Sequence, residues 1–210
     1  MNATQATPGR RARRNKRARG GSRVGGILAG LALAGAAIAA QVYALTPNEI
    51  DAPLTAAGSM GDEVDAWRFS VKADSVTTAK AVQTDAKTVP AEQFFLVVGL
   101  SATSAKEPTN IARPTLLTAD GNSYTVTDKV DTSRLITRPF VQPGFWIGGY
   151  AVFEVPADAL EGARIVLRLP GGGSFVEPYS PEAEIDLGID EAKAKQLSSS
   201  PQDVYSLKRS

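Results

Sequence analysis

Polar and apolar residues alternate in several short stretches between residues 61 and 190, which is the pattern of half-buried β-strands. The first of these stretches places four apolar residues on one face: Trp67, Phe69, Val71 and Ala73. The polar residues between them fall on the opposite face. The same period returns at 164–169 and at 184–189, so strands are expected there as well.

Another stretch, 92–103, is apolar on both faces through its middle. A strand that is covered on both sides lies in the centre of a sheet and not at its edge. We therefore expect 92–103 to be a central strand of the domain.

A tight turn separates two strand-like runs in TLLTADGNSYTV, with Asp120 and Gly121 at its centre. Glycine can take the positive φ that such a hairpin turn demands. At least seven strand candidates lie between residues 62 and 190, separated by turns of Pro, Gly and Asp. This spacing predicts an all-β domain over 61–190, built as an antiparallel β-sandwich.

Five of the fourteen aromatic residues fall in FVQPGFWIGGYAVFEVP, residues 140–156. Read with period two, one face is apolar throughout and is expected to join the core: Phe145, Ile147, Gly149, Ala151, Phe153 and Val155. The Pro-Gly pair at 143–144 turns the chain into this strand, and Pro156 helps to end it. Trp146 and Tyr150 lie on the other face, where their amphipathic rings suit either a partner or ordinary packing.

Residues 24–45 form a run of 22 positions without a charged side chain. As a helix rising about 1.5 Å per residue they would measure about 33 Å, enough to cross a hydrocarbon core of roughly 30 Å. Eight Lys and Arg residues and no acid precede this run in 1–23. Because basic residues resist translocation, we expect a single-pass signal anchor in the cytoplasmic membrane, with the N-terminus inside and the C-terminal domain outside.

The same apolar run leaves an alternative open, because it is rich in Ala and Gly and offers small-residue cleavage motifs at 37–39 and 42–44. A cleaved signal would give a secreted protein. Gly26 and Gly30 have the spacing that lets two helices approach closely, which would permit a weak homodimer. The basic segment 1–23 is expected to contact anionic membrane lipid and not nucleic acid, since no aromatic residue stands between its charges to stack on bases.

Two further segments flank the predicted sandwich. Residues 46–60 contain two Pro and no apolar periodicity, as expected of a linker. In the tail, 191–210, Asp190 is placed to cap a short helix, which the residues Ser198 to Pro201 should end. We expect the tail to be mostly disordered beyond Gln196, or to act as a docking peptide.

The amino-acid composition excludes several kinds of catalytic and metal-binding site. The chain has no Cys and no His, which removes thiol nucleophiles, thiolate metal sites and the commonest general base. Beyond Arg23 it has fifteen basic and twenty-two acidic residues, a formal charge of −7, yet no two carboxylates stand out as an acid–base pair. We therefore expect no catalytic residue, no cofactor and no bound metal, and a protein that is not an enzyme.

Three patterns remain as candidates for binding. Oxygen ligands for Ca²⁺ lie close together in the sequence, but without the usual calcium-loop spacing: Asp120, Asn122, Asp128 and Asp131. Alternating carboxylates would line one face of a strand, either solvated or facing a basic partner: Glu182, Glu184 and Asp186. The Gly-rich sequence PGGGS at 170–174 is not followed by the Lys-Ser or Lys-Thr of a phosphate-binding loop, and it is interpreted as a flexible connection.

The region from RPTLLTADGNSYTV to VQPGFWIGGYAVFEVPADALEGARIVLRL resembles a bacterial domain family of unknown function, found on lipoproteins and membrane-anchored exported proteins. The matching positions are Asp120, Gly121, Tyr124, Pro143, Gly144, Phe153, Val155 and Pro156. The resemblance covers roughly residues 61–170. It implies an immunoglobulin-like fold similar to that of a secreted mycobacterial immunoprotective antigen, with structural and not catalytic residues at these positions.

Taken together, these patterns predict a membrane-anchored, extracytoplasmic, non-catalytic binding or assembly module of the cell envelope, with a protein partner of unknown identity. Two alternatives stay open: a secreted hydrolase that uses carboxylates, and an accessory subunit of a membrane complex.

Overall fold

The computed structural model describes residues 32–36, 52–85, 87–171 and 179–207, and its chain divides into two units, 1–45 and 46–210. In the first unit the described residues, 32–36, are helical. The rest of the predicted span, together with Gly26, Gly30 and the basic segment, lies outside the described residues. Within the described ranges, no helix has both the length and the apolar character needed to cross a bilayer.

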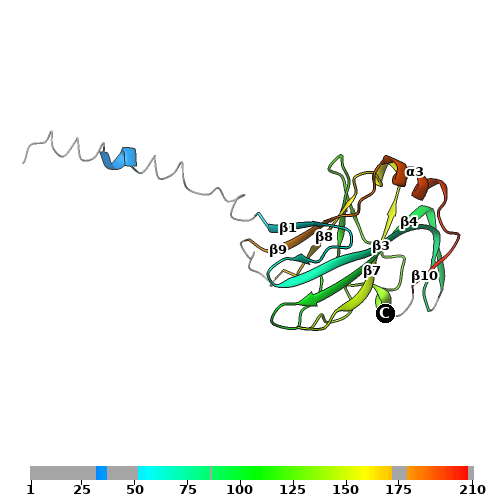
Figure 1. Cartoon of the computed structure of the whole chain (residues 1–210), viewed down its shortest axis with the longest axis horizontal. Helices are drawn as coiled ribbons and strands as arrows, with labels where there is room; N and C mark the ends of the chain where they lie inside the picture. The colour runs from blue at the N-terminus through cyan, green and yellow to red at the C-terminus, as the bar shows by residue number, and fades with distance from the viewer. Residues whose placement is uncertain (1–31, 37–51, 86, 172–178, 208–210) are drawn as a thin grey trace, which may run out of the picture. The chain divides into compact units, whose positions relative to one another are not determined.

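The second unit is built from two β-sheets that face each other (Figure 1). Its strands are β1 (Leu54–Ser59), β2 (Val64–Asp65), β3 (Phe69–Gln83), β4 (Thr88–Ser104), β5 (Thr115–Leu117), β6 (Ser123–Thr125), β7 (Ile147–Val155), β8 (Arg164–Arg168), β9 (Pro181–Asp186) and β10 (Tyr205–Ser206). Its helical elements are η1 (Thr132–Arg134), η2 (Ala157–Ala159) and α3 (Glu191–Ser199). Sheet A has the strand order β1-β9-β8-β5-β6, and sheet B the order β10-β3-β4-β7, with β2 also paired to β3. The predicted β-sandwich is confirmed.

The prediction of a fully antiparallel sandwich is wrong at two edges. Strand β1 pairs with β9 in parallel, with Leu54 opposite Pro181, and β10 pairs with β3 in parallel, with Tyr205 opposite Val82. Both strands come from the ends of the unit, where the entering and the leaving chain run along an edge. They cover backbone groups of β9 and β3 that an edge strand would otherwise expose.

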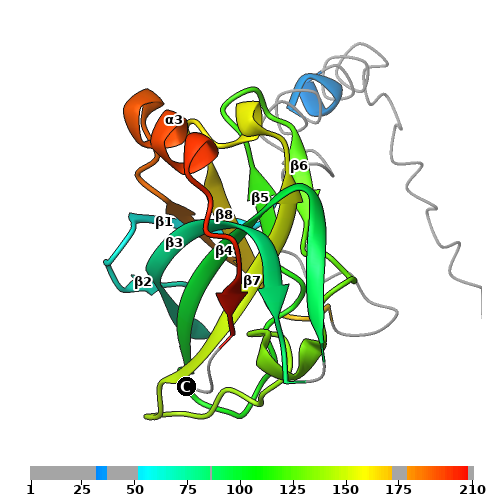
Figure 2. The same ribbon diagram turned by 90° about the vertical axis from the view of Figure 1, so that its right-hand side faces the viewer.

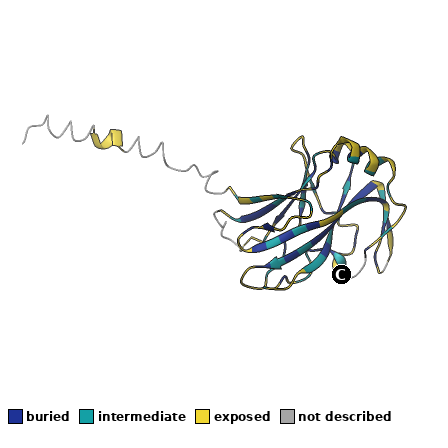
Figure 3. Ribbon diagram, viewed as in Figure 1, coloured by how far each residue is buried: buried dark blue, intermediate teal, exposed yellow. Residues whose placement is uncertain are grey.

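The main core lies between the two sheets and takes alternate residues of the strands, as Figure 3 shows by the alternation of buried and exposed colour. In β3, Phe69, Val71 and Ala73 are fully buried, as predicted. Trp67 was expected on the same face, and that prediction is wrong. It lies before β3 with its backbone at φ 59°, and its side chain is exposed.

Strand β4 is the central strand that the sequence predicts, because it lies between β3 and β7. Leu96 and Val98 face the main core. Phe95 and Val97 face the outer side of sheet B, where they pack in a second, smaller cluster. The loop before β7 and the C-terminal tail supply the cover on that side, through residues such as Leu135 and Leu207.

The predicted hairpin is confirmed. Strands β5 and β6 pair antiparallel, and Gly121 has φ 79° in the turn between them. The turn is closed by the N–H of Thr118, which donates to the carbonyl of Asn122 at 2.9 Å, and by the N–H of Gly121, which donates to the carbonyl of Thr118.

The two flanking segments are more ordered than the sequence indicates. Residues 54–59 of the expected linker form β1. The tail forms the predicted short helix, α3, and then β10 in the part expected to be disordered; β10 lies along β3 in Figure 2. Asp190 caps α3 as predicted, accepting a hydrogen bond from the N–H of Lys193, and the helix ends at Ser199. The tail is held because Leu207 is buried and the N–H of Gln202 donates to the carbonyl of Thr78 at 2.9 Å.

Candidate functional site

The aromatic stretch at 140–156 does not form a single surface. From Gly149 to Val155 the predicted apolar face is buried. Phe145 was expected on that face, but it is exposed, because its N–H donates to the carbonyl of Gln142 in a turn that precedes β7. Trp146 is exposed directly before β7, whereas Tyr150 is half-buried and packs against Tyr205.

A shallow depression of about 270 Å³ lies on the outer side of sheet B, and Tyr150 is one of its walls. Its lining combines small residues of the three strands with a single acid and a single aromatic ring: Asp74, Ser75, Gly99, Leu100, Ser101, Gly148, Gly149 and Tyr150. We call this depression the sheet B trough. Trp146 lies directly before β7, four residues before Tyr150, and does not line the trough.

The strand register explains why these residues meet. Gly99 of β4 pairs with Ser75 on one side and with Tyr150 on the other, so the three residues form one row across the sheet. Gly99 has no room for a side chain, since an added Cβ would lie 2.4 Å from the Oγ of Ser75. Ser101, two residues on, pairs with Gly148. The small residues at Ser75, Gly99, Ser101 and Gly148 therefore leave a shallow depression in the surface of the sheet.

Asp74 belongs to an irregularity in β3, where the pairing with β4 shifts between Ala73 and Ser75. This extra residue brings its carboxylate beside β4, where its Oδ2 accepts a hydrogen bond of 2.6 Å from the Oγ of Ser101. Bulges of this kind re-aim a side chain at the sheet surface. The trough thus offers a carboxylate, two hydroxyls and an aromatic ring, the mixture of polar groups and ring surface that orients a ligand.

Trp67, which the alternation in the sequence places in the core, is exposed and is a further candidate for binding. Its N–H donates to the side-chain Oδ1 of Asp65 at 2.9 Å, so the chain turns at this point and β3 begins only at Phe69. A signal for this turn was present in the sequence, because Asp often accepts a hydrogen bond from the backbone two residues further on. Trp67 lies beside Arg68, Lys106 and Glu107, around a small depression of about 100 Å³.

The four candidate calcium ligands are not brought together. Asp120 and Asn122 belong to the β5–β6 turn, and Asp128 is exposed. Asp131 caps η1: its carboxylate accepts the N–H of Ser133 at 2.7 Å, and hydrogen bonding to Ser133 holds its pKa below the usual value. In the part of the chain that the structure describes, no group of three Asp or Glu side chains is arranged to hold a metal.

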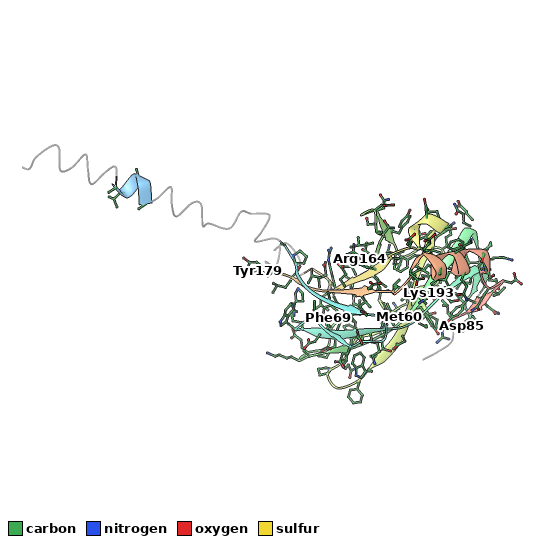
Figure 4. All side chains as sticks on the ribbon, turned by 45° about the horizontal axis from the view of Figure 1, so that its top comes forward. Met60, Phe69, Asp85, Arg164, Tyr179 and Lys193 are labelled. Atoms are coloured by element: carbon green, nitrogen blue, oxygen red, sulfur yellow. The ribbon has the colours of Figure 1, made fainter. Side chains whose placement is uncertain are left out.

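The predicted carboxylate stripe of β9 finds its basic partners on the neighbouring strand of the same sheet. The Oε1 of Glu184 accepts a hydrogen bond of 2.6 Å from Arg164, a residue labelled in Figure 4. Glu182 is buried, pairs with Arg168 and accepts a hydrogen bond of 2.8 Å from the hydroxyl of Thr55. The stripe is therefore largely neutralised within sheet A.

A second ion-pair group lies where β4 begins and β7 ends. Lys129 is 2.7 Å from Glu154 and 3.3 Å from Glu92. Partial burial raises the pKa of Glu154, but the Glu92 N–H and the Lys129 ammonium together outweigh burial and leave the pKa below its usual value. A general acid in glycoside hydrolysis needs a raised pKa, so the pKa of Glu154 is shifted in the wrong direction for that role.

Comparisons with known proteins add little beyond this geometry. No protein-family model matches the chain, and no curated protein matches it. Three solved structures are similar. The yjhA protein from Bacillus subtilis has a TM-score of 0.48 and 12% sequence identity, and the match covers 62% of this chain and 99% of that one. A secreted protein from Mycobacterium tuberculosis has a TM-score of 0.43 and 15% identity, with 64% and 98% covered, and an uncharacterised β-sandwich protein from Clostridium difficile has a TM-score of 0.40 and 11% identity, with 64% and 95% covered. Of the glycine-rich connection, residues 172–174 lie outside the described residues. The sheet B trough is the best-defined candidate site among the described residues.

Proposed function

We propose that this protein is a non-catalytic binding or assembly module of the cell envelope, carried outside the cytoplasmic membrane on an N-terminal anchor. The module would be the immunoglobulin-like β-sandwich. The observation that carries the proposal is the sheet B trough, where Asp74, Ser101 and Tyr150 surround small side chains at the surface of the sheet.

The composition of the trough favours a polar partner. Exposed hydroxyl groups exchange hydrogen bonds with water at little cost, and a partner that offers the same bonds can replace that water. The single carboxylate of Asp74 favours a partner that brings a donor or a positive charge. A short extended segment of another protein has this chemistry, and its side chains can lie against the ring of Tyr150.

The anchor is supported by the sequence. The uncharged run at 24–45 is long enough to span a bilayer, and the eight basic residues before it favour an N-terminus that stays inside. Anchoring would raise the local concentration of the module around partners in the same membrane. A modest site such as the trough could then be sufficient for assembly.

Site-specific photo-crosslinking in intact cells tests this function. A photoreactive amino acid that replaces Ser101 lies in the trough. The matched control carries the same photoreactive amino acid in place of Ser123, which is exposed on β6 of the other sheet. We expect a discrete adduct from position 101, in the membrane fraction, and none from position 123. Tyr150→Ala should weaken that adduct. Identical products from both positions, or no adduct from position 101, would contradict a binding role for the trough.

A further inference from the structure

The large exposed apolar side chains gather at one end of the sandwich. Four of them surround the ends of the sheet B strands, with exposed fractions of 57% for Trp67, 63% for Phe140, 67% for Phe145 and 46% for Trp146. Two more, Leu54 and Tyr179, lie where β1 and β9 begin in sheet A. Tyr179 and Asp85, labelled in Figure 4, lie at opposite ends of the sandwich. We call the Tyr179 end, with these six residues, the aromatic end.

The pairing of the strands shows that these residues share one end. Phe69, the first residue of β3, is opposite Ser104, the last residue of β4, and Ser104 also bridges to Pro143 just before β7. Figure 1 shows β3 and β7 beginning on the side where β1 begins. A cluster of exposed aromatic rings on a soluble domain marks an interaction site more often than a scatter of single residues does.

The backbone presents two of these rings outward in an unusual conformation. Among the described residues, the non-glycine positions with positive φ are Trp67, at 59°, and Tyr179, at 55°. Bulky residues rarely adopt this conformation, and strained backbone is concentrated at functional sites. At Trp67 the conformation is supported by the Asp65 carboxylate, which accepts the N–H of Trp67.

The chain also enters the sandwich at the aromatic end. The N–H of Leu54, at the start of β1, donates to the carbonyl of Ser180 at 3.0 Å, so the entry point is next to Tyr179. Eight residues, 46–53, lie between Leu54 and Leu45, the last residue of the predicted span. Such a segment reaches at most about 30 Å when fully extended. The proposed anchor would therefore keep the aromatic end close to the bilayer surface.

We infer that the aromatic end rests on the outer surface of the membrane that holds the anchor, with its rings in the headgroup layer. The inference rests on the proposed function, because it requires the anchor. Trp and Tyr favour this layer, since an apolar ring and a polar group are both accommodated there. Lys106 and Arg113 are exposed at the same end, where they can meet lipid phosphates. Docking would fix the orientation of the sheet B trough above the bilayer.

Tryptophan fluorescence tests the inference on the full-length chain, because its two Trp residues, Trp67 and Trp146, both lie at the aromatic end. The protein is reconstituted into vesicles of phosphatidylcholine and phosphatidylglycerol, with or without bromine near the headgroup end of the acyl chains. Interfacial rings penetrate about 5–10 Å, within reach of these bromines, so we expect emission to fall at least about twofold. Trp67→Phe and Trp146→Phe should each leave a remaining Trp that is still quenched.

Two variants separate docking from mere proximity. Phe145→Asp places a charge among the rings and should reduce the quenching, whereas Val204→Asp, at an exposed position near β10, should not.

Flotation of the vesicles at alkaline pH reports on the anchor alone. Flotation without lipid quenching, but with quenching by acrylamide, would overturn the docking inference and leave the anchor intact. Protection from both quenchers would overturn it in favour of contact between two copies. Failure to float would overturn both proposals.

Discussion

The ring of Tyr205 packs edge-on against the ring of Tyr150, with centroids 6.0 Å apart and planes inclined at 77°. Tyr150 stands at one wall of the sheet B trough, and Tyr205 belongs to the C-terminal strand. The tail is thus part of the structure that supports the trough. Its removal should affect both stability and binding.

Replacing Leu207 with Ala tests the structural role of the tail. Leu207 is 3% exposed and packs in the outer cluster of sheet B, so the change leaves a cavity there and should lower the free energy of unfolding by about 2–3 kcal/mol. Val204→Ala, at an exposed position three residues earlier, should change it by less than about 0.5 kcal/mol. Urea denaturation of the full-length protein measures both. Equal, small effects would show that the tail is not docked.

The Tyr pair predicts a loss of stability at high pH. Burial, followed by the interaction with Tyr150, raises the pKa of Tyr205 above the usual 10.0, so the folded state holds this proton more tightly than the unfolded state. The corresponding stability is complete below pH 10.0 and is lost as the pH rises through the raised pKa. Tyr205→Phe should remove this part of the pH dependence. The urea midpoint of unfolding is measured across the alkaline range for the wild-type protein and for Tyr205→Phe. If the midpoints of both proteins fall equally with pH, the prediction is contradicted.

The Arg168–Glu182 pair should respond unequally to the loss of each partner. The side chain of Glu182 is 6% exposed and that of Arg168 is 56% exposed, so Arg168→Ala leaves a buried charge without its ion-pair partner and should cost about 1–2 kcal/mol. Glu182→Gln removes the buried charge and keeps an acceptor for Thr55, at a cost below about 1 kcal/mol. In the Glu182→Gln background, Arg168→Ala should cost almost nothing. The same cost in both backgrounds, from denaturation curves, would refute the coupling.

Gly149 should not tolerate a side chain. A Cβ at this position would lie 2.7 Å from the Cα and 2.8 Å from the N of Ile136, because the backbone of Ile136 crosses the edge of β7 and its N–H donates to the carbonyl of Tyr150. Gly149→Ala must displace this backbone and should destabilise the protein by about 1–3 kcal/mol. Gly171→Ala, which meets no atom within 4 Å, is the control. A lowered melting temperature is expected for the first variant only.

The alternation of side chains in the sequence was enough to predict the strands that form the main core. Phe69, Val71 and Ala73 could be placed because a half-buried strand must present apolar residues to one side. Trp67 continued the same alternation, but the hydrogen bond to Asp65 turns the chain before it. The alternation therefore misplaced Trp67, because the conformation there is set by a local turn and not by a strand.

The sheet B trough could not have been predicted in the same way. Its row of Ser75, Gly99 and Tyr150 is created by the register of the hairpin β3–β4 and by the pairing of β4 with β7, which the long segment 105–146 separates from it in the sequence. The same holds for the tail, since Leu207 is buried by contacts with distant residues and its own segment has no apolar period. The parallel strand β1 escaped prediction because LTAAGS is joined to β9 mainly through its backbone.

The intact mass and the location of the native protein show whether the sandwich is held at the membrane by an uncleaved N-terminal anchor. Membrane and medium fractions are analysed before and after protease is added to whole cells whose wall has been removed. We expect a species of full mass, uncleaved after residue 39 or 44, in the membrane fraction only, from which external protease removes the sandwich and leaves the N-terminal segment protected. A shorter species in the medium that begins near residue 40 or 45 would contradict the anchor and the membrane docking built upon it.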